Sequence, residues 1–459
     1  MESFSLAAEQ LSPSLVAEIR EKTTGPVLVP GDDTFNEVRK VWNGMVDRKP
    51  ALIIRCQTVN DVITGVNAAR KNHLQVAIRG GGHNVTGNAV CDGGIMIDLS
   101  LLKKVQVDPE QMTAKAQTGA TWGDFDKATQ VYGLATTGGL ISTTGIAGLT
   151  LGGGVGWLVR HHGMSCDNLI SAEVVTATGE LVTASTTENP DLFWGLRGAG
   201  GNFGVVTSLT YRLHPVSQVF GGMILYPRTE AQKVIRHFRE FMATAPDELT
   251  LYAALLHSPN GQPVVGIMGC HSGDVSTGES VLKPIREFGS PLLDTFSEQP
   301  YLQMQTMLDG PFPHGNRYYW KSGFLDELSD EAIDTIIQQA ETVPSPLTPI
   351  IFELYGGKAA EEPEGGTSYP HRMNQFDLVV ISNWVTPEDD EKNISWTRAL
   401  WEAVQPYTSN RVYVNALGIE GEQRVREAYG KNYNRLQEIK KKYDPENLFC
   451  LNQNIQPGS

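Results

Sequence analysis

RGGGHNVTG, residues 79–87, is the stretch on which the fold of this chain depends. Three adjacent glycines follow the apolar run LQVAI (74–78), which is typical of a buried strand. Glycine triplets disfavour both helix and strand, and they leave a backbone that a bulky ligand can approach closely. Their N–H groups can form a nest for a pyrophosphate, and Arg79 could supply positive charge. The sequence therefore predicts that this loop, followed at once by His83, binds a cofactor.

Glycine is concentrated around this loop. Of the 47 glycines in the chain, 24 lie between Gly80 and Gly204, about a quarter of the length. Two more clusters occur there, GIAGLTLGGGVGWL (145–158) and RGAGGNFGVV (197–206). We expect all three clusters to contact the same ligand.

Composition excludes several other functions. A chain of 459 residues predicts two or three domains, and a net charge of −15 argues against binding to nucleic acid or an anionic membrane. The amino-terminal residues do not resemble a signal peptide, so we expect a cytoplasmic protein.

The five cysteines are scattered without a CxxC pair, and no metal site is predicted. GxGxxG, GxxxxGK[ST], HExxH and GxSxG are all absent.

Secondary-structure signals change near residue 216. Before it, a helix over 59–72 with a capping box at Thr58 and Asp61, a hairpin through 104–120 and a helix over 122–132 are predicted. After it, strands at 249–259 and 263–273 form a hairpin signal through Asn260 and Gly261. Helices at 229–242 and 329–343 and a strand at 376–384 follow. This later part predicts an antiparallel sheet backed by helices.

Four segments carry a resemblance to a known family. IRGGGHNVTGNAVCDGGIMIDLS, GLTLGGGVGWLVRHHGMSCDNLISAEVVTATGELV, NPDLFWGLRGAGGNFGVVT and YGKNYNRLQEIKKKYDPENLFCLNQNIQP resemble, in order, the berberine-bridge-enzyme-like FAD-linked oxidases of the vanillyl-alcohol-oxidase type. The resemblance implies an α+β, two-domain PCMH-type FAD-binding fold. The FAD-binding domain would span residues 1–215 and be completed by 411–459, with a substrate domain over 216–410.

The resemblance also assigns cofactor contacts. His83 would be bonded covalently to the 8α carbon of FAD. Further contacts are implied for Arg79, Gly80, Gly81, Gly82, Asn84, Thr143, Thr144, Gly145, Gly148, Gly152, Gly153, Gly154, Asn202, Gly204, Val205, Val206, Gln453 and Asn454. Many relatives carry a second tether, a cysteine, but Ile141 occupies its place, and Cys166 matches a position where no flavin bond forms. A single tether is expected.

The catalytic base is less clearly marked. Relatives that use a tyrosine in a Tyr-x-Asn-Tyr run have it where this chain has Ala416. Asp377 lies where relatives often place an acid, and a desolvated carboxylate there would suit proton abstraction. The alternative is an aspartate that faces solvent or pairs with Arg372; Tyr413 is a weaker candidate base.

The aromatic run HGNRYYWKSGF (314–324) suggests a cavity wall with Tyr318, Trp320 and Lys321, although such residues are also typical of a sheet core. The leading expectation is an oxidase that takes hydride from an alcohol, whether sugar, phenolic or secondary metabolite, and reduces O2 to H2O2. Amine oxidation of the hydroxynicotine-oxidase kind, a dehydrogenase that avoids O2, and a non-catalytic flavoprotein remain alternatives.

Overall fold

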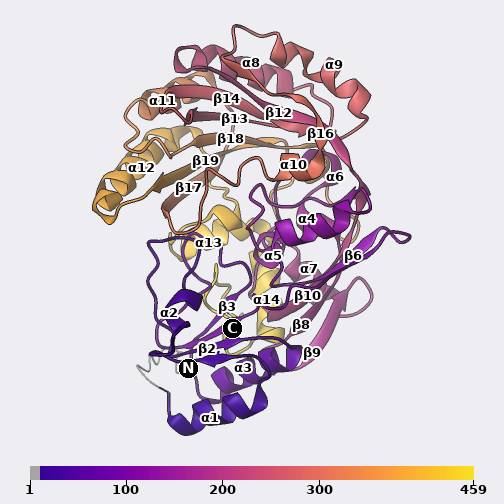
Figure 1. The fold of residues 1–459 in the computed structure, drawn as a ribbon, viewed down its shortest axis with the longest axis vertical. Helices are drawn as coiled ribbons and strands as arrows, with labels where there is room; N and C mark the ends of the chain where they lie inside the picture. The colour runs from indigo at the N-terminus through magenta and orange to yellow at the C-terminus, as the bar shows by residue number, and fades with distance from the viewer. Residues whose placement is uncertain (1–10, 459) are drawn as a thin grey trace.

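The computed structural model describes residues 11–458 and has an α+β fold, as the sequence predicts. Figure 1 shows a large sheet with its helices above a second body that contains both ends of the described chain. The strands of the large sheet all come from residues 218–384, inside the segment expected to form the substrate domain. No helix within 11–458 has the length and apolar character needed to cross a membrane.

The glycine loop is positioned by a small sheet with the order β1-β2-β4-β3. Its strands are β1 (Val27–Leu28), β2 (Leu52–Arg55), β3 (Val76–Arg79) and β4 (Ile95–Asp98), with β2 and β3 both parallel to β4. Helices α1 (Pro13–Lys22), α2 (Phe35–Val38) and α3 (Val59–Lys71) accompany it. The predicted capping box of Thr58 and Asp61 is present, because each side chain accepts a hydrogen bond from the other's backbone N–H. The glycine loop leaves the carboxyl end of β3.

A second sheet, ordered β5-β6-β10-β8-β9, is antiparallel. It consists of β5 (Val105–Asp108), β6 (Thr113–Gln117), β8 (Leu169–Val175), β9 (Leu181–Ser185) and β10 (Val205–Arg212); a separate pair joins β7 (Leu134–Ala135) and β11 (His214–Pro215). The associated helices are α4 (Trp122–Gln130), α5 (Ile146–Leu151), α6 (Val159–His162), α7 (Pro190–Leu196), α13 (Glu422–Tyr429) and α14 (Tyr433–Tyr443). One hydrophobic cluster joins Phe125 and Leu209 to Tyr429 and Leu436. Residues from both halves of the chain therefore share a core.

The large antiparallel sheet has the order β15-β12-β14-β13-β18-β19-β17, with β16 also paired to β12. Its strands are β12 (Gln218–Pro227), β13 (Leu249–His257), β14 (Pro263–His271), β15 (Leu293–Asp294), β16 (Ser297–Pro300), β17 (Arg317–Leu325), β18 (Ile350–Tyr355) and β19 (Gln375–Trp384). Its helices are α8 (Ala231–Met242), α9 (Val275–Arg286), α10 (Tyr301–Gln305), α11 (Asp330–Ala340) and α12 (Asp390–Val404). The predicted β13–β14 hairpin turns at Gly261, where φ is +81°.

The two faces of this sheet have different partners. Helices α8, α9, α11 and α12 lie over the outer face (Figure 1), where Phe352 and Leu378 join the helix side chains in one hydrophobic cluster. Because side chains alternate along a strand, Ile351 and Val379 point to the inner face and join residues of the other body, such as Trp157. The inner face of the sheet therefore closes over the glycine-rich segments.

Candidate functional site

A cavity of ≈ 380 Å³ lies between the inner face of the large sheet and the glycine-rich segments, within the size range of ligand-binding clefts. The glycine loop after β3, the start of α5, the segment before β10, residues 449–453 and strands β17, β18 and β19 all contribute to its wall. The cavity therefore gathers segments from both ends and the middle of the chain.

Glycines shape one side of this cavity. A Cβ on Gly81 would come within 2.4 Å of the Gly145 backbone N, so these two loops contact each other at a distance that excludes any side chain. Gly148, Gly200 and Gly201 line the cavity, and a Cβ on any of them would meet open space. Asn452, also in the wall, has a buried Oδ1 without a hydrogen-bond partner in residues 11–458. The wall thus offers a glycine cradle and unused polar atoms, which fit a flat ligand held by backbone groups.

His83 stands at the edge of this cradle. Its ring stacks on Trp42 with centroids 4.2 Å apart, and its Nε2 lies 3.5 Å from Thr143 Oγ1. Burial, with a smaller contribution from the charge of nearby His314, lowers the pKa of His83 to about 3. The imidazole is therefore neutral and carries a free lone pair at physiological pH.

The structure brings most of the predicted cofactor contacts to the cavity. Those in the wall are Gly80, Gly81, Gly82, His83, Asn84, Thr144, Gly145, Gly148, Asn202, Gly204, Val206 and Gln453. Thr143 lies beside His83. Gly152, Gly153, Gly154, Val205 and Asn454 lie behind the wall. Among these, Gly154 donates its N–H to the Tyr413 hydroxyl, and the Val205 side chain joins a separate core.

The Arg79 side chain does not line the cavity, contrary to its predicted contact with the cofactor. The guanidinium is buried and bonds Asp98 at 2.6 and 2.9 Å, because β3 and β4 place these two residues opposite each other. It also donates to the carbonyls of Val38 and Lys40. Arg79 therefore braces the base of the glycine loop and is not available to a phosphate.

Asp377 proves to be half of a buried carboxyl pair. Neighbouring strands β18 and β19 set Glu353 opposite Asp377, and the Tyr355 hydroxyl lies 3.1 Å from Glu353 Oε2 and 3.2 Å from Asp377 Oδ2. Ser322 donates a further bond of 2.9 Å to Asp377. Asp377 is fully buried and lies behind the cavity wall, whereas Glu353 lines the cavity. Asp377 therefore faces neither solvent nor Arg372.

Burial raises the pKa of both acids. The pKa of Asp377 rises to about 7 by desolvation. The pKa of Glu353 rises to about 8, through desolvation first and then through the charge of Asp377. Between them, the two carboxyl groups can hold or release a proton near neutral pH.

Tyr413 lines the cavity but is poorly suited to accept a proton. Its hydroxyl oxygen already accepts hydrogen bonds of 2.8 Å from the Gly154 N–H and from Asn415 Nδ2. Burial raises the pKa of Tyr413 well above its usual range. Ala416, which stands where the resemblance places a tyrosine, also lines the cavity and offers no group that could accept a proton.

Of the three predicted substrate contacts, Trp320 alone reaches the cavity. Tyr318 stacks on Trp42 with centroids 3.6 Å apart and donates its hydroxyl to the Pro313 carbonyl. Lys321 points to the other side of β17, where its Nζ lies 2.9 Å from Glu420. Contrary to prediction, Tyr318 and Lys321 therefore do not line the cavity; they contact residues behind it.

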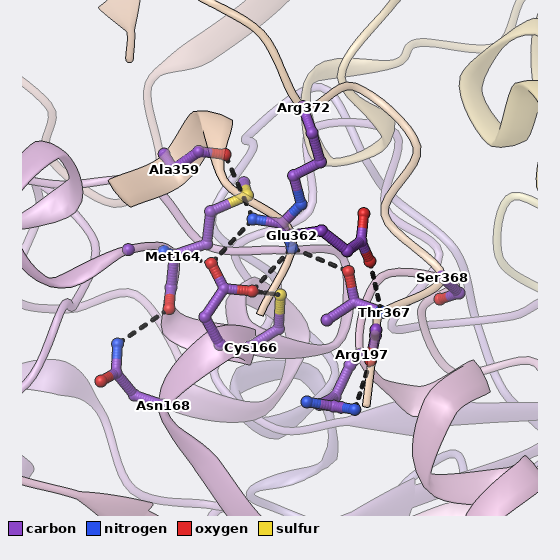
Figure 2. Close-up of polar contacts among 12 residues, drawn as sticks. Met164, Cys166, Asn168, Arg197, Ala359, Glu362, Thr367, Ser368 and Arg372 are labelled. Atoms are coloured by element: carbon purple, nitrogen blue, oxygen red, sulfur yellow. Dashed lines mark hydrogen bonds and ion pairs between the residues drawn. The ribbon is translucent and has the colours of Figure 1, made fainter. Parts of the chain in front are cut away.

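Cys166 lies away from the cavity, in the network that Figure 2 shows. Its Sγ is 3.5 Å from Asp167 Oδ1, and burial raises the pKa of the thiol. Arg372 makes two hydrogen bonds to Asp167, at 2.6 and 2.8 Å, and a third to Thr367 (Figure 2). This buried ion pair fastens the loop between β18 and β19 to the segment after α6.

Sequence reasoning missed Glu353, Trp42 and Asn415, all of which line the cavity. Glu353 carried a readable signal, because it is the one charged residue in the apolar run IIFELY (350–355). Asn415 is the asparagine of the run YVNA (413–416), which was considered only for its tyrosine positions. Trp42 carried no signal, since only the folded chain brings it beside His83.

Comparisons with known proteins identify the relatives of this chain. Residues 50–185 match the family model "FAD binding domain", and residues 412–456 match "Berberine and berberine like". An FAD-linked oxidoreductase of Dictyostelium discoideum is 34% identical over 450 residues, covering 96% of this chain and 97% of the relative. The (R)-6-hydroxynicotine oxidase of Paenarthrobacter nicotinovorans is 30% identical and covers 94% and 97%. The solved 6-hydroxy-D-nicotine oxidase of Arthrobacter nicotinovorans superposes with a TM-score of 0.87 at 28% identity, covering 98% and 100%.

Proposed function

The chain belongs to the berberine-bridge-enzyme-like FAD-linked oxidoreductases, and from this premise we propose that it oxidises an alcohol carbon of a small molecule with FAD bound covalently through His83 and O2 as final electron acceptor. When bound, FAD supplies the hydride acceptor and the route by which the electron pair reaches O2. The remaining steps depend on the protein's own side chains.

His83 is the proposed attachment point. Its imidazole is neutral, lies at the edge of the glycine cradle and is held by its stack on Trp42. His83 would hold the FAD through a covalent bond from one imidazole nitrogen to the 8α carbon, in place of one N–H and one C–H bond. O2 would take up, as H2O2, the two protons and two electrons that forming this bond releases. We propose no second attachment through Cys166, because its thiol is buried and does not line the cavity.

Glu353 is the proposed base, and its position in the cavity wall is the observation that carries the proposal. The ionised carboxylate takes the O–H proton of the substrate while the adjacent C–H leaves as hydride. The Tyr355 hydroxyl, in reach of both acids, can share the proton with Asp377. Each turnover then converts an alcohol to a carbonyl with release of two electrons and two protons, which O2 accepts as H2O2.

Amine oxidation is a second candidate, favoured by the charge of the wall. Glu353 is the one acid that lines the cavity, and no Lys or Arg among residues 11–458 joins it there. An ionised carboxylate without a countercharge would attract an ammonium group. The similarity to a hydroxynicotine oxidase points the same way.

The test compares wild type with Glu353→Gln under anaerobic conditions. Candidate alcohols and their matched amines should bleach the flavin of the wild type, and bleaching should slow by about 100-fold or more in the variant at unchanged flavin content. Readmitted air should restore the flavin and produce H2O2. A variant that bleaches at the wild-type rate would refute the role of Glu353, and flavin that stays reduced in air would indicate a dehydrogenase.

A further inference from the structure

The part of the cavity wall that the large sheet supplies is built mainly from hydrocarbon side chains. The residues between 216 and 410 that line the cavity are Leu308, Phe312, Trp320, Ile351, Glu353, Tyr355, Val379 and Ile381. Five of these side chains contain no polar atom. Apolar side chains of this kind stabilise a ligand in proportion to the apolar surface that the ligand buries.

Polar groups on this wall are few and mostly occupied. The Tyr355 hydroxyl lies between Glu353 and Asp377. Trp320 Nε1 is buried and has no partner in residues 11–458. On this wall a ligand therefore meets hydrocarbon side chains and, as its main polar group, the Glu353 carboxyl. A sugar would bring several hydroxyls with no partner here, and each would weaken binding by about tenfold.

The wall also lacks positive charge. No Lys or Arg in the described part of the chain lines the cavity. Lys321 follows the wall residue Trp320 in sequence, but its ammonium group pairs with Glu420 on the other side of β17. A carboxylate or phosphate would enter a desolvated site that contains only an acid, which is unfavourable.

We infer that the substrate is a small, ring-bearing and largely apolar alcohol whose reactive hydroxyl is its one strongly polar group, and that it is neither a carbohydrate nor an anion. This inference rests on the proposed function, because it takes Glu353 and the sheet wall as the substrate side of the cavity. Rings fit this wall because Trp320 and Phe312 contribute aromatic side chains to it.

The test measures binding to the flavin-loaded enzyme with three probes that each carry an oxidisable hydroxyl group: 4-methylbenzyl alcohol, 4-(hydroxymethyl)benzoate and glucose. Dissociation constants come from the change in flavin absorption and from the ligand-induced rise in melting temperature. We expect 4-methylbenzyl alcohol to bind about tenfold or more tightly than either other probe. Equal or tighter binding of glucose or the benzoate, or no binding of any probe, would overturn the inference.

Two variants examine the cause of this preference. At pH 9, where the Glu353 carboxyl is mostly ionised, Glu353→Gln removes a negative charge from the wall, so benzoate binding should strengthen about tenfold while binding of the neutral alcohol stays within about twofold. Lys321→Ala is the matched control, and it should leave the order of the three probes unchanged because that lysine lies outside the cavity. Loss of benzoate binding in Lys321→Ala would show that a cation does reach the ligand, against the inference.

Binding and turnover separate the two proposals. A neutral alcohol that binds tightly without bleaching the flavin would refute the proposed oxidation and leave the inferred ligand class intact. Glucose that binds tightly and bleaches the flavin would do the reverse.

Discussion

Replacement of Glu353 by Gln should change how the stability of the protein depends on pH. In the folded chain the Glu353 carboxyl is desolvated and faces the charge of Asp377, so its pKa rises from 4.5 to about 8. In the unfolded chain the same group is in water. The folded state therefore holds the proton more tightly than the unfolded state.

The size and sign of the effect follow from this difference. The stabilisation from a raised pKa is fully present below about pH 4.5 and is lost as the pH rises through about 8. Since one pKa unit corresponds to about 1.4 kcal/mol, the wild type should lose about 4 kcal/mol between pH 5 and pH 9 from this group. Glutamine does not titrate, so Glu353→Gln should gain that amount relative to the wild type over the same interval.

Urea unfolding followed by tryptophan fluorescence at pH 5 and pH 9 would measure this difference. Glu361→Gln is a matched control, because Glu361 lies on the surface, paired with Lys358, and should show no comparable pH-dependent gain. If the stability difference between Glu353→Gln and the wild type is the same at both pH values, the carboxyl pair does not titrate as the structure implies. The reasoning would then be wrong.

Three further predictions concern other parts of the site. In His83→Ala the flavin should leave the protein on acid denaturation, whereas Cys166→Ala should retain it. In-gel flavin fluorescence measures which variant keeps the flavin, and release from Cys166→Ala would contradict the single attachment. Arg372→Met should destabilise the chain by about 3–5 kcal/mol in urea unfolding because it leaves the buried Asp167 without a countercharge. Adding Asp167→Leu should recover part of the loss, and equal stabilities of Arg372→Met and the wild type would contradict this. Gly148→Val should leave the melting temperature of the flavin-free protein nearly unchanged but reduce the flavin-to-protein absorbance ratio, since the valine side chain would enter the open cradle. Full flavin content in this variant would show that the ligand lies elsewhere.

The cofactor side of the site could be predicted from sequence because local patterns encode it. Glycine runs and a histidine adjacent to one of them are recognisable without knowledge of tertiary contacts, and these residues line the cavity. The capping box at Thr58 and the hairpin turn at Gly261 are local in the same way.

The substrate side could not be predicted to the same extent, because strand register assembles it. Glu353 and Asp377 meet only through the pairing of β18 with β19, and Arg79 meets Asp98 only through the pairing of β3 with β4. Lys321 is an avoidable error, since a strand turns alternate residues to opposite faces and Lys321 cannot share a face with Trp320.

The placement of residues 449–453 in the cavity wall has a consequence for biosynthesis. These residues are translated after the entire large sheet, yet they stand beside the glycine loop that was made about 370 residues earlier. A nascent chain that has emerged only as far as β19 lacks this part of the wall and also lacks helix α14, which packs in the same core as β10. We therefore expect the chain to bind FAD only after synthesis of these residues. A polypeptide truncated within α14 would lack part of the cavity wall and would not retain the cofactor.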